Sequence, residues 1–170
     1  MKRAIALLEK HNLLKIISDE LDINLEIPHI AYVEVKRPDS KAILFTNVVD
    51  RKKNKKFKEP VLMNVFCNED AVKLFIGDGD KIGSEIESLL KLKPPVTFSE
   101  KLSTLGKLFS LKNTIPKKIK GKGICQEVIK LGADAKLSDL PVIKTWEEDG
   151  GAFITMGQVY TQSLNGELKN

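Results

Sequence analysis

The sequence predicts a mixed α/β protein in which a layered α/β region is followed by a region of strands. Two nearly continuous apolar runs, residues 42–49 and 60–66, are typical of strands that are covered on both faces. Stretches with helical periodicity precede and follow these runs, which favours a sheet flanked by helices. From residue 124 onward the candidate elements are strands. The expected fold class is therefore α/β of the α+β kind.

The amino terminus predicts a helix and then a short strand. Leu7 and Leu8 fall at helical spacing with Ala4, while charged residues occupy the other side, so residues 1–11 are expected to form an amphipathic helix. The apolar run 13–17 has the length of a strand. We expect the charged pair Asp19-Glu20 to end it.

The next stretch supports two interpretations. Ile23, Leu25 and Ile27 alternate as in a strand. Pro28, however, suits the first turn of a helix, because its missing N–H is not needed there. We favour a helix that begins at about Pro28 and ends at Arg37-Pro38, since the residue before a proline disfavours helical geometry.

Local end signals predict two helices after the apolar runs. Asn68 is a suitable N-cap, the acidic residues that follow it complement the helix dipole, and Gly77 ends this helix. Asp80 is expected to open the next one, which Pro94-Pro95 would stop. A further helix is expected from the spacing of four residues: Ser99, Leu102, Leu105 and Phe109.

A change of pattern divides the chain into regions. We assign residues 1–112 to an α/β domain, residues 113–123 to a linker rich in Pro, Gly and charge, and residues 124–170 to the start of a β domain. Within the last region the strand candidates are 124–129, 141–145 and 152–161.

The longest of these strands is expected to enter a hairpin. Asp149-Gly150-Gly151 opens it, and Asn165-Gly166 supplies a turn that requires positive φ. Only four residues follow this turn, so the second strand has barely begun and its partners are missing. We therefore expect the sequence to be the front part of a longer protein.

Composition and charge restrict the function classes. The 170 residues are 42% hydrophobic and 30% charged, as in globular proteins. No run approaches the roughly 20 apolar residues of a membrane span, and no leader pattern opens the chain, so we expect a cytoplasmic protein. Cys67 and Cys125 lack metal or redox spacing and are expected to be free thiols.

The net charge of +5 raises the question of nucleic-acid binding. The densest basic run, residues 51–58, lies between two predicted strands and contains one aromatic residue, Phe57. It lacks the spacing of a recognition helix and of a stacking platform. We expect an exposed connecting loop and no nucleic-acid partner. The alternative hypothesis is a stand-alone basic interaction module that binds nucleic acid or a partner subunit.

Spacing alone gives little catalytic signal. His11 and His29 are far apart and form no HxxxH or HxH pattern, so structural histidines are expected. The sequences Gly77-Asp78-Gly79 and Gly121-Lys122-Gly123 lack the later glycine and the Lys-Ser or Lys-Thr pair of a phosphate loop. We interpret both as turns.

A series of short motifs carries more information. Five of them follow one another in the last third of the chain: Gln126-Glu127-Val128, Asp139-Leu140-Pro141-Val142-Ile143, Trp146, Asp149-Gly150-Gly151-Ala152-Phe153-Ile154-Thr155, and Asn165-Gly166-Glu167-Leu168-Lys169-Asn170. In order and spacing they resemble the UbiD-type decarboxylases, which use prenylated FMN. The earlier segments are similar to the N-terminal domain of that family: Glu34-Val35-Lys36-Arg37-Pro38, residues 42–48 and residues 60–64. The resemblance covers essentially the whole chain.

The resemblance implies a non-oxidative carboxy-lyase. Its substrate would be an aromatic or α,β-unsaturated acid, such as a polyprenyl-4-hydroxybenzoate of ubiquinone biosynthesis. It also implies that residues 124–170 begin a split β-barrel that binds the flavin. The family holds the flavin phosphate through Mn²⁺ or Mg²⁺, with K⁺ nearby, on an Asn, a His and a Glu. Asn170 matches that Asn, and Thr155 matches a residue that lines the flavin pocket.

The same resemblance implies which parts are missing. The metal-binding His and Glu, the catalytic glutamate and arginine residues, and the C-terminal domain that mediates homo-oligomerisation would lie beyond residue 170. We therefore expect no catalytic residue in this chain and no activity from it alone. No transmembrane segment is implied, although a lipid-tailed substrate fits peripheral membrane association. Asp39-Ser40 replaces glycines that are usual in the family, and Ala152 replaces a common proline.

Overall fold

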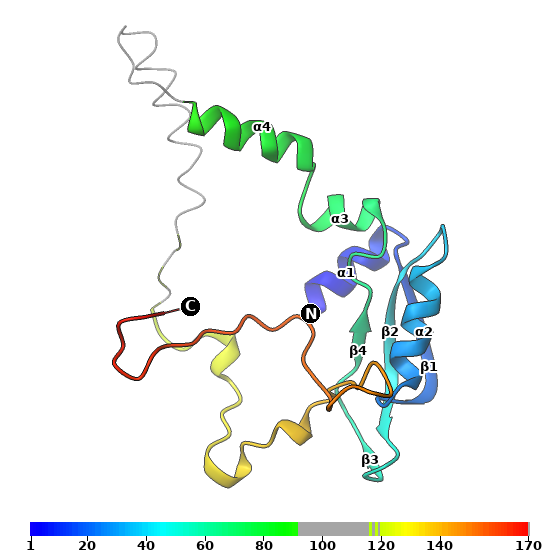
Figure 1. Ribbon diagram of the computed structural model, residues 1–170. Coiled ribbons are helices and arrows are strands. Elements are labelled where there is room, and N and C mark those ends of the chain that lie inside the picture. Colours follow the sequence, from blue (N-terminus) through cyan, green and yellow to red (C-terminus); the bar gives the residue numbers. More distant parts are fainter. Residues whose placement is uncertain (92–115, 117, 119, 170) are drawn as a thin grey trace, which may run out of the picture. The chain divides into compact units, whose positions relative to one another are not determined.

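The computed structural model describes residues 1–91, 116, 118 and 120–169 (Figure 1). These residues form two compact units, one of Met1–Ile76 with Lys136–Asn170 and the other of Gly77–Ala135. The stop expected at Pro94-Pro95 and the helix expected around Phe109 lie outside the described residues. The domain limits expected from the sequence stay predictions.

A small mixed sheet organises the first unit. Strand β2 (Ala42–Asp50) pairs in parallel with β1 (Leu14–Asp22), starting at the pair Leu14↔Ala42. It pairs antiparallel with β3 (Lys55–Lys56) and with β4 (Val61–Met63). Figure 1 shows β2 running through the middle of this sheet, and nearly all of its side chains are buried. Together with the helices, this arrangement confirms the mixed α/β fold class.

Strand β1 is longer than the sequence predicts. The charged pair Asp19-Glu20 does not end it, because the chain shifts register there by a bulge between Ile17 and Glu20. Pairing then resumes at Glu20↔Asn47 and continues to Asp22. A bulge lets one strand accommodate extra residues without losing its partner, which explains why the expected end is wrong.

The first two helices lie where the sequence predicts them. Helix α1 spans Lys2–Lys10, with Leu8 buried, and α2 spans Glu26–Val35. Pro28 lies in the first turn of α2, as its missing N–H favours. Of the two interpretations of this stretch, the helix is confirmed.

The helix predicted after Asn68 is also confirmed. Helix α3 spans Glu69–Phe75, and Asn68 Oδ1 accepts a hydrogen bond from Ala71 N at 2.9 Å. The chain then turns at Gly77, whose φ of +97° suits glycine.

Helix α4, in the second unit, begins earlier than expected. It spans Gly79–Leu90, and its N-cap is Asp78 rather than Asp80. Asp78 Oδ1 accepts hydrogen bonds from Asp80 N at 3.1 Å and from Lys81 N at 3.4 Å. The preceding aspartate therefore satisfies the free amides at this helix end.

The hydrophobic core lies between α2 and the sheet and receives one residue from the far end of the sequence. Ile143 is 5% exposed and packs with Ile27 of α2 and Phe45 of β2. The complete buried cluster is Ile23, Ile27, Ile43, Phe45, Val48, Phe57, Val61 and Ile143. The segment around residue 143 is thus an integral part of the first unit.

Most of the strands expected after residue 123 do not form. Residues 124–129 contain the short 3-10 helix η2 (Ile124–Gln126), so the strand predicted there is wrong. Two further 3-10 helices follow, η3 (Gly132–Asp134) and η4 (Leu137–Asp139). Ile124 and Val128 are 86% and 78% exposed. Their apolar sequence resembles a strand, but these residues have no neighbouring strand within the described ranges.

Isolated bridges replace the other expected strands. Ile143 pairs with Phe153 in the antiparallel sense, and Gln162 pairs with Lys169. Between the latter two, Gly166 has a φ of +74°, and Ser163 N donates to Leu168 O at 2.9 Å. The predicted positive-φ turn is therefore confirmed, whereas the flavin-binding barrel stays a prediction. Within the described ranges, every helix is too short or too polar to span a bilayer.

Candidate functional site

The segment that carries the predicted flavin-pocket residue is fastened to the first unit by backbone hydrogen bonds. Lys144 N donates to Ile23 O at 3.1 Å, and Leu25 N donates to Lys144 O at 3.0 Å. Phe153 N in turn donates to Ile143 O at 3.1 Å. Three stretches that are distant in the sequence thus lie next to one another, and the strand-like part of residues 141–145 is anchored in the core.

A tight bend connects the paired residues Ile143 and Phe153. Trp146 N donates to Asp149 Oδ2 at 2.8 Å, and Asp149 N donates to Trp146 O at 3.2 Å. Lys144 Nζ donates to the carbonyl oxygen of Glu147 at 2.7 Å. The side chains of Asp149 and Lys144 therefore hold this turn.

A groove of about 430 Å³ lies beside the returning segment. Phe153 and Ile154 contribute to one wall, and Phe57 and Leu140 also line it. Its surface is apolar in this part, which suits a flat or aliphatic group. Ala152, where the family usually has proline, lies on the same wall.

The polar end of this groove is an acidic cluster held by an amide. Asn24 Nδ2 donates to Asp22 Oδ1 at 3.0 Å and to Asp50 Oδ1 at 3.3 Å. Asp22 and Asp50 are only 8% and 4% exposed. Lys53 Nζ lies 3.5 Å from Asp50 Oδ2. Because each buried carboxylate accepts hydrogen bonds, this cluster is satisfied internally.

A lysine holds the segment that contributes Ser138 to the groove lining. Lys55 Nζ donates to Ser138 O at 2.6 Å and lies 3.1 Å from Asp139 Oδ1. The same ammonium group lies 5.3 Å from the ring centroid of Phe57. Lys55 therefore ties the β2–β3 hairpin to residues 138–139.

Four cations of the basic run, residues 51–58, have acidic partners within 4 Å. In addition to Lys53 and Lys55, Arg51 Nη1 lies 2.8 Å from Glu26 Oε2, and Lys56 Nζ lies 3.7 Å from Glu20 Oε2. The Arg51 hydrogen bond is the main reason that the pKa of Glu26 lies below its ordinary value. Most of the run is exposed, as predicted, and it comprises the turn after β2 together with the short strand β3.

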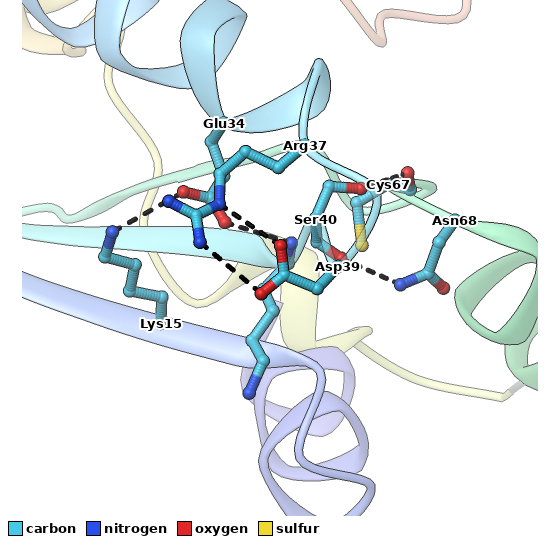
Figure 2. A network of polar contacts seen from close by, with 8 residues as sticks. Lys15, Glu34, Arg37, Asp39, Ser40, Cys67 and Asn68 are labelled. Atoms are coloured by element: carbon cyan, nitrogen blue, oxygen red, sulfur yellow. Dashed lines mark hydrogen bonds and ion pairs between the residues drawn. The ribbon is translucent and has the colours of Figure 1, made fainter.

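A polar network fixes the turn after α2 (Figure 2). Glu34, 8% exposed, accepts hydrogen bonds from Lys15 Nζ at 3.5 Å and from Lys41 N at 3.3 Å. Ser40 Oγ donates to Cys67 O at 2.7 Å, and Asn68 Nδ2 donates to Ser40 O at 2.8 Å. Figure 2 shows these side chains converging from β1, α2 and the start of α3.

This network explains the residues that replace the glycines usual in the family. Asp39 accepts two hydrogen bonds from Arg37, at 3.2 and 3.4 Å, and neither Asp39 nor Ser40 has positive φ. The turn therefore needs no glycine. Cys67 is a free thiol, as predicted, and burial raises its pKa. The side chain of Cys125 is not among the described ones.

Of the two predicted site residues, the structure describes Thr155 but not Asn170. Thr155 is exposed and follows directly after the groove wall, in a turn. Asn170 lies outside the described residues, so its role as a metal and cofactor ligand stays a prediction. Among the described residues, no three His, Cys, Asp or Glu side chains form a group that could hold a metal ion.

Three structurally important residues were not identified from the sequence. Asp149 was part of a quoted motif, but its hydrogen bond to Trp146 N could not be derived from spacing. Lys55 lay within a basic run that suggested only a solvated loop. Asn24 gave no signal, because its two acidic partners are on different strands.

The chain matches two domain models of one protein family. Residues 5–90 match the N-terminal domain of 3-octaprenyl-4-hydroxybenzoate carboxy-lyase, and residues 117–170 match its Rift-related domain. The two matches occur in this order along the chain.

Curated relatives of this chain are longer proteins. An uncharacterized protein of Helicobacter pylori is 42% identical over 175 residues, which cover 100% of this chain and 28% of the relative. An uncharacterized protein of Aquifex aeolicus is 37% identical over 166 residues, covering 96% of this chain and 32% of the relative. The chain thus spans about a third of the length of these relatives.

Proposed function

The chain belongs to the UbiD family of 3-octaprenyl-4-hydroxybenzoate carboxy-lyases, and from this premise we propose that it is the N-terminal part of a non-oxidative decarboxylase. The substrate class is an aromatic or α,β-unsaturated acid, such as a polyprenyl-4-hydroxybenzoate. The observation that carries the proposal is the ordered match of both domain models to one chain. A match to only one of the two domain models would support the decarboxylase proposal less strongly.

The proposed cofactor is prenylated FMN. When bound, such a flavin supplies the electron sink for the bond that breaks as CO₂ leaves. The described residues fit one wall of a flavin site: Phe153 and Ile154 offer apolar surface, and Thr155 offers an exposed hydroxyl that can donate or accept a hydrogen bond. In the proposed function, this wall orients the ring system and excludes water from one side.

The proposed metal is Mn²⁺ or Mg²⁺, with K⁺ nearby. The amide oxygen of Asn170 would be one ligand, which suits a hard cation that also contacts phosphate. The described residues provide no cluster for the remaining ligands. We therefore assign those ligands, and the catalytic acids and bases, to the part of the protein that the longer relatives possess, and we expect this chain alone to be inactive.

The alternative function, a basic interaction module, has less structural support. A nucleic-acid site needs cations that are available to phosphates. Arg51, Lys53, Lys55 and Lys56 each have an acidic neighbour within 4 Å, namely Glu26, Asp50, Asp139 and Glu20, which lowers the net positive charge that this run presents. We therefore retain the enzyme proposal. In it, the full-length protein is a cytoplasmic homo-oligomer that contacts the membrane peripherally when its substrate is a lipid-tailed acid.

The proposal can be tested with the full-length protein co-produced with a flavin prenyltransferase. We expect the purified protein to carry a flavin absorbance band and to release CO₂ from at least one aromatic acid in a panel that includes a prenylated 4-hydroxybenzoate. The variant Asn170→Ala should lose bound metal, measured by elemental analysis, while it remains folded. Retention of stoichiometric metal by this variant would refute the role of Asn170.

A further inference from the structure

The bend between Trp146 and Asp149 is closed by a side chain, and this determines how the following segment returns. Asp149 is half-buried, and its Oδ2 atom accepts the hydrogen bond from Trp146 N at 2.8 Å. Two glycines follow, Gly150 and Gly151, which impose little conformational preference of their own. The acceptor on Asp149 therefore restrains the bend together with two other hydrogen bonds, from Lys144 Nζ to Glu147 O and from Asp149 N to Trp146 O.

The consequence of this restraint is seen at Phe153. Its amide donates to Ile143 O at 3.1 Å, which is an isolated bridge and not part of a longer ladder. Ile143 itself is fixed, because it is 5% exposed in the core and its neighbour Lys144 is bonded to Ile23 and Leu25. Phe153 is 44% exposed, and within the described ranges its backbone pairing is this isolated bridge, so its register depends on the bend.

From these contacts we propose that Asp149 is a positioning residue for the flavin wall formed by Phe153, Ile154 and Thr155. This inference rests on the proposed function. Asp149 fixes the bend, the bend sets the Ile143–Phe153 register, and the register sets the place of Thr155 two residues later. Asp149 makes no ion pair within the described ranges. Its role therefore requires a hydrogen-bond acceptor and not a negative charge.

The acceptor requirement gives a discriminating set of variants. Asp149→Ala removes the acceptor, whereas Asp149→Asn keeps a side-chain oxygen at the same position. Glu148→Ala is the matched control, because Glu148 is an adjacent, exposed acid with no hydrogen bond in the described structure. Asp149→Asn should behave like the wild type, apart from a modest weakening, because a neutral acceptor forms a weaker hydrogen bond than a carboxylate.

Two measurements on the full-length protein test the proposal. The first is hydrogen exchange of the peptide containing Phe153 in protein without flavin. We expect Asp149→Ala to speed exchange there roughly tenfold, the factor that corresponds to the loss of about one hydrogen bond. The second is a flavin-binding experiment that gives both the affinity for flavin and the visible circular dichroism spectrum of the bound flavin. We expect Asp149→Ala to weaken affinity by a similar factor and to change the spectrum, and Asp149→Asn to restore both.

The possible results separate this inference from the proposed function. If the wild type binds no flavin when co-produced with the prenyltransferase, the proposed function fails, and the inference fails with it. If the wild type binds flavin and Asp149→Ala binds it equally well, only the inference is refuted. It is also refuted if Asp149→Asn resembles Asp149→Ala, or if Glu148→Ala has the same effect on the flavin spectrum.

Discussion

The amide of Phe153 donates a hydrogen bond to the carbonyl oxygen of Ile143 at 3.1 Å, and Ile143 is buried in the core formed by α2 and the sheet. Within the first unit, this hydrogen bond connects the core to the segment that carries Thr155, the residue predicted to line a flavin pocket. The position of Ile143 in the core therefore determines where the segment that begins at Phe153 lies. Several measurable consequences depend on this connection.

Replacement of Ile143 by alanine should destabilise the first unit. The side chain is 5% exposed, so its truncation leaves a cavity among Ile27, Phe45 and their neighbours. We expect the free energy of unfolding to fall by about 2–5 kcal/mol, measured by urea denaturation. Ile154→Ala is the control, because Ile154 is 60% exposed, and it should change stability by no more than about 0.5 kcal/mol. Equal losses for both variants would contradict the placement of Ile143 in the core.

Removal of the Glu34 carboxylate should also destabilise the fold. Glu34→Ala leaves Lys41 N without its acceptor and Lys15 without its partner, in a site where Glu34 is 8% exposed. An unsatisfied buried group costs about 1–3 kcal/mol, which thermal or urea unfolding can measure. Asp39→Ala removes an exposed carboxylate that pairs with Arg37, and it should have a much smaller effect. A larger loss from Asp39→Ala would be inconsistent with the network in Figure 2.

The α3 cap offers a test of local structure. Asn68 accepts from Ala71 N through its side-chain oxygen and donates from its side-chain nitrogen to Ser40 O. Asn68→Ala should cost about 1 kcal/mol of stability. Asn68→Ser keeps a side-chain oxygen that can cap the helix and loses the donation to Ser40, so it should retain most of the stability. If Asn68→Ser were as unstable as Asn68→Ala, the contact with Ser40 and not the cap would dominate.

The pair of Glu26 and Arg51 should make stability depend on pH in acid. The hydrogen bond from Arg51, followed by that from the backbone of Asp22, lowers the pKa of Glu26 below its ordinary value of 4.5. The unfolded chain therefore binds a proton more readily, and the stabilisation is present above pH 4.5 and is lost as the pH falls through the lower, folded-state pKa. Arg51→Gln should flatten this decline, whereas Lys52→Gln should not. Parallel unfolding curves for wild type and Arg51→Gln between pH 5 and pH 2 would argue against the pairing.

Sequence patterns predicted the elements whose signals are local. Asn68 and Gly77 marked the ends of α3 because caps and positive φ act on neighbouring residues. The Asn165-Gly166 turn is present for the same reason. Asp78 took the capping role expected of Asp80, since two adjacent candidates differ only in their detailed geometry.

Elements that depend on distant partners were predicted less well. The charged pair Asp19-Glu20 appeared to end β1, but parallel pairing with β2 carries the strand past it through a bulge. Residues 124–129 have the composition of a strand and no described neighbour to pair with. The hydrogen bond from Trp146 N to Asp149 Oδ2 was not predicted, because no sequence pattern indicates it. The proposal that Asn170 is a metal ligand comes from family resemblance, because no local sequence pattern indicates it.

The central claim is that this chain is the N-terminal part of a flavin-dependent carboxy-lyase. The most direct measurement is CO₂ release by the full-length protein, produced with and without a flavin prenyltransferase, from a panel of aromatic and α,β-unsaturated acids. The account predicts release with at least one acid, only in the preparation that carries the modified flavin, and none from residues 1–170 alone. Full-length protein that binds no flavin and releases no CO₂ from any acid of the panel would contradict it.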